Sequence, residues 1–258
     1  MGAARYARPP SAKPSDPGAA ARAAFVRPLM CGRFGLSLDD RDVEAAFPSY
    51  HLAAGVTWTP RYNIAPTQPV LAIKNDGARE ITALRWGLVP SWAQDPSIGS
   101  RMINARIETV AEKPAFRVAL RRRRAAIVAD AYYEWRRNGD GTKTPMRIHL
   151  RSDEPFLFAG LWEWWRPRDA QEGDPGLETC AILTAAPNGA GLAAIHNRIP
   201  IILRPENRDA WLAPGELTPT RALSLADPIP ADAITWYPIS RRVNSVRNDE
   251  PSIIAPAG

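Results

Sequence analysis

Four polar residues stand where the surrounding sequence gives no structural reason for a polar side chain. They supply a thiol, a carboxamide, a carboxyl group and an imidazole: Cys31 in RPLMCGRFGL, Asn104 in RMINARIET, Glu134 in DAYYEWRR and His196 in IHNRIPIIL. A nucleophile, an acid–base group and an orienting amide are components of covalent catalysis. Together the four residues predict a catalytic site, provided that the fold brings them close to one another.

Each of these residues also has a structural interpretation when it is considered alone. Cys31 could be a small buried hydrophobe, and Asn104 could cap a helix. Glu134, between two aromatic residues, could be the solvent-facing member of an alternating strand, and His196 could be a structural histidine. The catalytic interpretation therefore depends on the set and not on any single member.

Short strands joined by tight turns are expected to position the set. Residues 69–86 predict a hairpin around an Asn-Asp-Gly turn, and residues 125–150 predict two strands around a Gly-Asp-Gly turn. Residues 155–165 and 179–187 predict further strands. No repeat and no regular βαβ alternation is visible. We therefore expect the α+β class, with a mainly antiparallel β-sheet curled into a barrel-like core and short peripheral helices.

The expected helices are few and short. Residues 37–47, SLDDRDVEAAF, predict a helix that Ser37 caps, with acidic residues in its first turn and an apolar stripe. Residues 105–124 predict a helix that is broken near Pro114, and residues 204–212 predict another short helix. These helices are expected to lie outside the sheet.

The chain divides into an unusual leader and one domain. Residues 1–29 are rich in Ala, Pro and Arg and have no hydrophobic period, so we expect them to be disordered. They could be a cleaved segment, a transit peptide, a basic tail or the result of a start codon assigned too far upstream. Residues 30–258 are long and apolar enough for a single catalytic domain with a packed core.

Composition narrows the cellular setting. Two cysteines, Cys31 and Cys180, cannot form a disulfide framework and favour a reducing compartment. No apolar run approaches the length of a membrane span, so a cytoplasmic protein with no membrane partner is expected. The net charge is +6, and residues 1–29 account for four of these charges with five basic residues and one acidic residue. Overall charge is thus weak evidence for nucleic-acid binding.

Nine motifs occur in the order that is typical of one protein family. The chain resembles the SOS response-associated peptidase family, whose members are also described as abasic-site processing proteins. The motifs are MCGRFGL, RYNIAPTQ, WGLVPSWA, MINARIET, DAYYEW, FAGLWE, ILTAAPN, HNRIP and NSVRNDEPSII. They run from Met30 almost to the C-terminus, so the resemblance covers nearly all of the chain outside the leader.

The resemblance implies a protein that crosslinks covalently to abasic sites in single-stranded DNA. The open-chain form of an abasic site presents an aldehyde, which an amine attacks to form an imine. An α-amine has a pKa of about 7.7–8.0, against about 10.4 for lysine, so far more of it is neutral at pH 7. The thiol of an N-terminal cysteine can then close a five-membered thiazolidine ring. Cys31 can do this only as the first residue, after Met30 is removed.

Roles for the other members of the set follow from the same resemblance. Glu134 would be a general acid and base that moves protons during ring opening and imine formation. His196 would assist opening of the sugar and later reversal of the link, because its pKa lies near the working pH. Asn104 would form hydrogen bonds at the amine and the sugar and orient the nucleophile.

A DNA-binding surface is expected around these catalytic residues. It would combine arginines for phosphates, tryptophans for stacking on unpaired bases, and an amide and a proline beside an unstacked base. The candidates are Arg33, Asn63, Pro66, Trp86, Trp92, Arg106 and Arg117. One of the two tryptophans could instead belong to the core. The basic run Arg121–Arg124 could bind DNA or form a solvated helix end, and Trp164–Trp165 could face the surface or a partner.

Two kinds of ligand are not expected. Three histidines and two cysteines show no spacing such as CxxC or HExxH, so no metal site is predicted. No glycine-rich loop is suited to a phosphate, so no cofactor is predicted. A monomer is sufficient for the expected chemistry.

Two other functions remain open from the sequence. The first is a cysteine peptidase of the SOS response that uses Cys31 as an N-terminal nucleophile, with His196 or Glu134 as its base, and that could remove its own leader. The second is a non-catalytic module that binds single-stranded DNA through its basic residues and tryptophans. Lyase action at abasic sites through the imine is a further possible outcome of the crosslinking chemistry.

Overall fold

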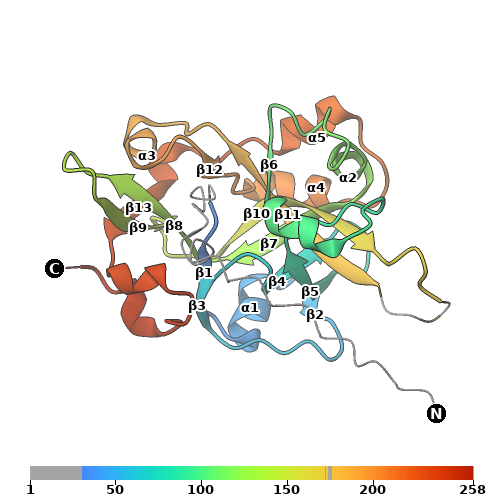
Figure 1. Ribbon diagram of the computed structural model, residues 1–258, viewed down its shortest axis with the longest axis horizontal. Helices are drawn as coiled ribbons and strands as arrows, with labels where there is room; N and C mark the ends of the chain where they lie inside the picture. Colours follow the sequence, from blue (N-terminus) through green and yellow to red (C-terminus); the bar gives the residue numbers. More distant parts are fainter. Residues whose placement is uncertain (1–30, 172, 174–175, 258) are drawn as a thin grey trace, which may run out of the picture.

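A computed structural model describes residues 31–171, 173 and 176–257 (Figure 1). The predicted leader, residues 1–29, and Met30 lie outside these ranges. The description of the predicted domain therefore begins at Cys31, three residues before the first strand.

One sheet carries the strands next to Cys31. It is antiparallel throughout, in the order β13-β9-β8-β1-β3. Its members are β1 (Phe34–Leu36), β3 (Arg61–Ile64), β8 (Ala131–Arg137), β9 (Lys143–Leu150) and β13 (Ile234–Pro238). The hairpin of β8 and β9 turns at the predicted Gly-Asp-Gly sequence, since its last pair is Arg137 and Lys143.

The other sheet closes on itself. Its order is β12-β11-β10-β7-β4-β5-β2, and an additional parallel pairing of β11 with β5 joins five strands into a closed barrel. Its members are β2 (His51–Leu52), β4 (Pro69–Lys74), β5 (Glu80–Trp86), β7 (Arg124–Ala129), β10 (Phe156–Trp165), β11 (Leu177–Ala185) and β12 (Ile199–Pro200), with β6 (Asn104–Arg106) beside β11. The predicted α+β class with a barrel-like core is confirmed.

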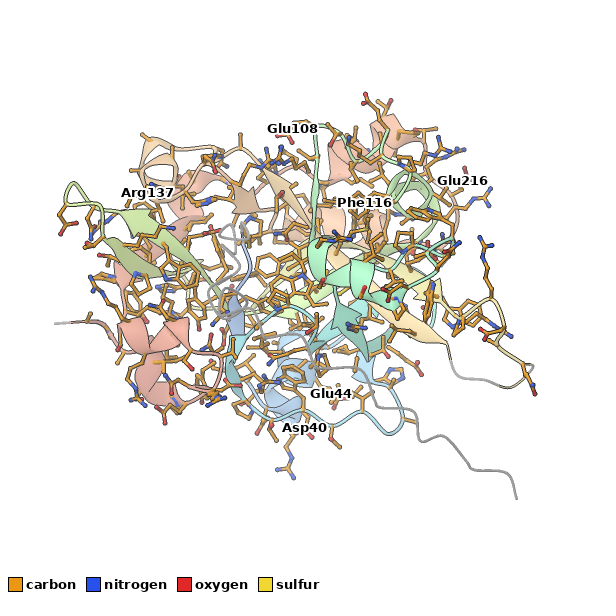
Figure 2. All side chains as sticks on the ribbon, viewed as in Figure 1. Asp40, Glu44, Glu108, Phe116, Arg137 and Glu216 are labelled. Carbon is orange, nitrogen blue, oxygen red and sulfur yellow. The ribbon has the colours of Figure 1, made fainter. Side chains whose placement is uncertain are left out.

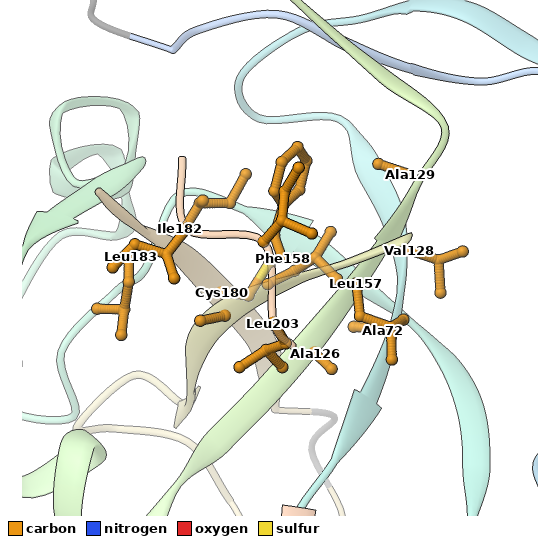
Figure 3. Packing of buried hydrophobic residues seen from close by; sticks show 14 of the residues in the cluster. Ala72, Ala126, Val128, Ala129, Leu157, Phe158, Cys180, Ile182, Leu183 and Leu203 are labelled. Carbon is orange, nitrogen blue, oxygen red and sulfur yellow. The ribbon is translucent and has the colours of Figure 1, made fainter. Parts of the chain in front are cut away.

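The barrel is filled by small and aliphatic side chains. Figure 3 shows Cys180 of β11 among residues of β7 and β10, and its thiol is fully buried. Burial raises the pKa of the Cys180 thiol well above its usual value, so this cysteine is a core residue. Gly160 allows β10 to approach β7, because a Cβ there would lie 2.0 Å from Cδ1 of Ile127.

Short helices cover the outside of the sheets, as predicted (Figure 1). The α-helices are α1 (Asp40–Ala46), α2 (Arg117–Arg122), α3 (Ala190–Ile195), α4 (Arg208–Leu212) and α5 (Pro219–Leu225). The 3₁₀ helices are η1 (Pro96–Arg101), η2 (Pro205–Asn207), η3 (Ala231–Ala233), η4 (Arg241–Asn244) and η5 (Pro251–Ile254).

Three local predictions differ from the structure. The cap of α1 is Asp39, because the N–H and hydroxyl of Ser37 both donate to Asp130. Asp130 also separates β7 from β8, so residues 125–150 contain three strands and not two. Residues 105–124 are mostly turns, with a helix only in α2, because the segment begins as β6 in parallel pairing with β11. Tertiary pairing here overrides local propensity.

The basic run after residue 120 is engaged within the protein. Arg121 and Arg122 pair with Glu216 beside α2 (Figure 2). Arg123 forms an ion pair of 2.7 Å with Glu163, and Arg124 is fully buried. These contacts favour the structural interpretation of the run over the DNA-binding one.

The two neighbouring tryptophans at the end of β10 face opposite ways. Trp165 is buried and donates from Nε1 to the carbonyl of Ala93 at 2.7 Å. Trp164 is 43% exposed and lies beside the guanidinium of Arg166. Within the described ranges, no helix is long and apolar enough to cross a membrane.

Candidate active site

The backbone nitrogen of Cys31 lies against the carboxyl group of Glu134. This N–H donates to Oε1 of Glu134 at 2.7 Å. The strand register explains the contact: Phe34 of β1 pairs with Tyr132 of the antiparallel β8, so the chain before β1 runs alongside the residues that follow Tyr132. The atom that would become the α-amine is thus already at the carboxyl group.

Glu134 is buried, although it lies in an amphipathic-looking strand. Its exposed fraction is 3%, so the interpretation of this residue as a solvent-facing strand member is wrong. Burial raises the pKa of the Glu134 carboxyl to about 8, against the smaller opposite effects of two backbone hydrogen bonds and the charge of Lys143. Glu134 therefore holds a proton at neutral pH and can exchange it near that pH.

Asn104 reaches the same backbone segment from a different sheet. It belongs to β6, where it pairs with Ile182 of β11, and its Nδ2 donates to the carbonyl of Cys31 at 3.3 Å. The helix-cap interpretation of Asn104 is therefore wrong. Alternation along β6 places Arg106 on the same face as Asn104, and Arg106 is exposed.

His196 lies close to the carboxyl group of Glu134, on the side of β8 that α3 covers. It directly follows α3, which packs on β8, and its Nε2 lies 3.9 Å from Oε2 of Glu134. Its Nδ1 lies 3.2 Å from both the backbone N and the backbone O of Arg198. Nδ1 thus has a partner whether or not it carries a proton. Burial lowers the pKa of the His196 imidazole, so its neutral form is favoured.

An ion pair fixes the backbone that holds His196. Both oxygens of Glu108 accept hydrogen bonds from Arg198, at 2.5 and 2.8 Å, and Arg198 also donates to the carbonyl of Thr184 at 2.6 Å. This pair was not predicted from the sequence. A signal existed, because Glu108 and Arg198 carry opposite charges within two of the motifs.

The thiol of Cys31 is enclosed by protein. The residue is 1% exposed, and burial, followed by the charge of Glu134, raises the pKa of the Cys31 thiol well above its usual value. The backbone of Cys31 has a φ of 44°, in the left-handed region that residues other than glycine rarely adopt.

A cavity of about 700 Å³ opens beside Glu134 and His196, whereas Cys31 and Asn104 do not line it. Four predicted site residues line it: Arg33, Pro66, Glu134 and His196. Among its other lining residues are three with large or charged side chains that were not predicted from the sequence: Trp135, Arg137 and Lys143. The hairpin prediction contained a signal for the last two, since they stand on either side of its turn.

Two predicted DNA-binding residues are structural. Trp86 is fully buried and donates from Nε1 to the carbonyl of Ile103 at 2.9 Å, so it cannot stack on a base. Asn63 is also fully buried, and its Oδ1 accepts a hydrogen bond of 2.7 Å from Arg33. Both predictions were wrong for the same reason: partners that are distant in sequence cover these side chains.

The remaining DNA-binding candidates are spread over the surface. Trp92 is 52% exposed, on the segment between β5 and β6. Arg117 is exposed at the start of α2, which packs against β7, β10 and α5 and lies away from α3 and β8 (Figure 1). Neither residue lines the cavity. Their roles, like that of Arg106, stay predictions.

No group of three or more potential metal ligands gathers within the described ranges. What does gather is an amine position, a thiol, a protonated carboxyl group and an imidazole, held by a closed barrel and the sheet beside it. These features define a class of α+β barrel proteins with a nucleophilic side chain, a buried carboxyl group and an imidazole at one site.

Comparison with known proteins assigns the family. Residues 30–246 match the model of the SOS response associated peptidase (SRAP) family, and the chain belongs to this family. The resemblance noted from the motifs is thereby confirmed. The chain is 45% identical over 226 residues to the abasic site processing protein YoqW of Bacillus subtilis, covering 87% of this chain and 99% of that one.

Two further similarities support the assignment. The chain is 32% identical to the abasic site processing protein YedK of Escherichia coli, covering 88% of this chain and all of YedK. The fold is similar to a crystal structure of a Bacteroides thetaiotaomicron protein, with a TM-score of 0.78, 25% identity, and coverage of 88% of this chain and 100% of that one.

Proposed function

We propose that this protein processes abasic sites in single-stranded DNA by forming a covalent thiazolidine crosslink through Cys31. The proposal requires Cys31 to be the first residue, because only then is its nitrogen an amine. The observation that carries it is the distance of 2.7 Å between the nitrogen of Cys31 and Oε1 of Glu134, beside a cavity that Glu134 and His196 line. The names of YoqW and YedK agree with this substrate.

The reaction needs proton transfers that Glu134 is suited to perform. The neutral amine adds to the aldehyde carbon, and the resulting hydroxyl leaves as water to give the imine. A carboxyl group with a pKa of about 8 can donate the proton that the leaving hydroxyl requires, and its carboxylate can then take the proton that the same nitrogen loses when the imine forms. His196 is positioned to relay a proton to the sugar during ring opening.

The thiol enters after the amine. With its pKa raised, Cys31 keeps its S–H, and its sulfur adds to the imine carbon once that carbon is attached to the same residue. The S–H proton passes to the nitrogen, and the five-membered ring closes with one water released overall. An imine that is not captured can lose the neighbouring phosphate by β-elimination, after a base removes a proton from the carbon next to the imine. Lyase activity is therefore part of the proposal.

The same properties disfavour the peptidase alternative. A cysteine peptidase attacks with a thiolate, and its cysteine normally has a lowered pKa. The Cys31 thiol has the opposite shift. One chain also contains the whole set of residues, so a monomer that acts on DNA in the cytoplasm satisfies the proposal.

The test uses protein that begins at Cys31 and a labelled single-stranded oligonucleotide with one abasic site. We expect a covalent species on a denaturing gel, with a mass equal to protein plus DNA minus one water. Glu134→Gln should form it about 10²- to 10⁴-fold more slowly. Absence of any covalent species with the intact N-terminal cysteine would contradict the proposal.

Two controls separate the amine from the thiol. Cys31→Ala keeps the α-amine, so its imine should be captured only when borohydride is added. Protein with any residue in front of Cys31 has no α-amine at this position and should form no thiazolidine. A stable adduct from either protein without a reductant would show that another nucleophile reacts.

A further inference from the structure

The β8–β9 hairpin places two cations side by side at the cavity. Arg137 and Lys143 are direct partners in the ladder, so their side chains leave the hairpin on the same face. Both line the cavity with Glu134 and His196, and Figure 2 shows Arg137 on this hairpin at the edge of the molecule. Like charges that are directly opposite each other destabilise a sheet.

No acidic side chain among the described residues forms a close ion pair with either cation. Among the described residues, no carboxylate lies within 4.0 Å of Arg137 or Lys143. Two other cations, in contrast, have carboxylate partners: Arg123 pairs with Glu163, and Arg198 is held by Glu108. The hairpin thus carries two positive charges without a close ion-pair partner, next to the carboxyl group of Glu134, where an anion would be attracted.

We propose that Arg137 and Lys143 form a subsite for one phosphodiester of the DNA strand, beside the abasic nucleotide. A guanidinium can hold two phosphate oxygens, and an ammonium group can approach a third. The proposal rests on the proposed function, since it names the part of the substrate that this side of the cavity recognises. Its tests do not require the crosslink to form.

The wall between the subsite and the catalytic residues is well fixed. Trp135 lies two residues before Arg137 on β8, and its Nε1 donates to Oδ1 of Asn244 at 2.8 Å. The guanidinium carbon of Arg33 lies 6.0 Å from the centre of the same indole ring. Lys143 is close enough for its charge to lower the pKa of both Glu134 and His196. A phosphate at the hairpin would therefore lie near the reacting sugar.

Binding is measured with a single-stranded oligonucleotide that carries a tetrahydrofuran analogue of the abasic site, which has no aldehyde. Arg137→Gln and Lys143→Gln should each weaken binding about three- to tenfold at 0.1 M salt. Each should also reduce the slope of log affinity against log salt by about 0.7. Arg221→Gln is the matched control, because this exposed arginine lies on α5, outside the cavity.

A double variant tests whether the two cations share one ligand. If they do, Arg137→Gln/Lys143→Gln should lose less affinity than the product of the single losses. Phosphodiesters of the oligonucleotide are then replaced one at a time by neutral methylphosphonates. At one position the replacement should weaken binding by the wild-type protein and leave binding by the double variant unchanged. Single variants that bind like Arg221→Gln would overturn the proposal. The proposal would also be overturned if inorganic phosphate competed for the protein as strongly as unlabelled oligonucleotide does.

A further measurement keeps this proposal separate from the proposed function. Protein that begins at Cys31 should react with a small free aldehyde, such as propanal, at the same rate in wild type and in both single variants. A loss of that reaction in the variants would mean that the hairpin acts on the chemistry, and would contradict a phosphate subsite. Failure of the wild-type protein to react would count only against the crosslinking function.

Discussion

At the scale of single residues, Glu134 combines two properties that rarely occur together. It is almost completely buried, and yet it lies next to a cavity that a substrate can enter. Desolvation favours the neutral carboxyl group, while the backbone N–H of Cys31 favours the charged one. The balance leaves a pKa of about 8, so this carboxyl group can both give and take a proton near neutral pH.

This pKa also predicts how stability depends on pH. Between the ordinary glutamate value of 4.5 and about 8, the folded protein keeps a proton at Glu134 that the unfolded chain has released. Stability should therefore fall as pH rises through this range. Glu134→Gln cannot ionise, so its stability relative to wild type should rise by about 2–3 kcal/mol between pH 6 and pH 8.

Urea unfolding of both proteins at several pH values measures this effect. The glutamine side chain still offers an oxygen to the N–H of Cys31, so the fold of the variant should be unchanged. Asp140→Asn serves as a control, because Asp140 is exposed at the hairpin turn and its pKa is lowered, mainly by a hydrogen bond from Thr142. A stability difference between Glu134→Gln and wild type that is constant with pH would contradict the prediction.

At the scale of elements, the C-terminal segment holds one side of the cavity. The amide group of Asn63 donates to the carbonyls of Val243, Ser245 and Asn248 at 3.2, 3.0 and 2.7 Å. Arg33 donates to the same Val243 carbonyl at 2.8 Å and to Oδ1 of Asn63. One buried amide thus connects β3, the segment 243–248 and an arginine of the cavity.

Asn63→Asp tests this connection with almost no change in shape. The aspartate still accepts from Arg33, but it loses the donor to three carbonyls and places a negative oxygen against them. We expect a loss of about 2–4 kcal/mol in stability, since buried carbonyls lose their partner. Limited proteolysis should cut residues 243–249 before the rest of the chain. Uniform cleavage of the whole domain would contradict a local role.

Arg124 has a comparable role at the other end of the molecule. Its guanidinium is fully buried and donates to the carbonyls of Arg121, Trp211, Ala213 and Gly215, with no carboxylate within 4.0 Å among the described residues. It therefore ties the ends of α2 and α4 to the barrel strand β7. Positive charge at helix C-termini is favourable.

Arg124→Met should destabilise the protein by about 3–5 kcal/mol, because several buried carbonyls lose their donor at once. The urea midpoint measures this loss. Arg122→Met is the control, since Arg122 is exposed and pairs with Glu216 on the surface, and it should change stability by less than about 1 kcal/mol. Equal losses in the two variants would show that burial of Arg124 is not what matters.

The parts of the fold that could not be predicted from the sequence also lie at the scale of elements. Turn chemistry identified the hairpins of β4–β5 and β8–β9, because Asn-Asp-Gly and Gly-Asp-Gly act locally. The structure of residues 105–124 and the burial of Asn63 and Trp86 were not predicted, because each depends on a partner that is far away in the chain. The set of Cys31, Asn104, Glu134 and His196 was recognised by its motifs, but no pattern gave the buried state of Glu134.

At the scale of the whole molecule, we expect the closed barrel to be the part of the structure most resistant to local unfolding. Five strands leave no free edge, and β7 and most of β10 and β11 are buried. Backbone amides in these strands should exchange with solvent only on global unfolding, while those at the β8–β9 turn should exchange much faster. Hydrogen exchange followed by mass spectrometry checks this, and fast exchange in β7 would contradict it.

The pairing of β11 with β5 has a consequence for the time at which the candidate site assembles. It joins Thr179 to Arg85, and β11 also carries the strand that holds Asn104. During synthesis, therefore, the barrel cannot close until residues beyond 180 have left the ribosome. A nascent chain in which Cys31 is already the first residue would have the free amine and the thiol, but its site would not yet be assembled. Assembly of the site thus follows completion of most of the chain.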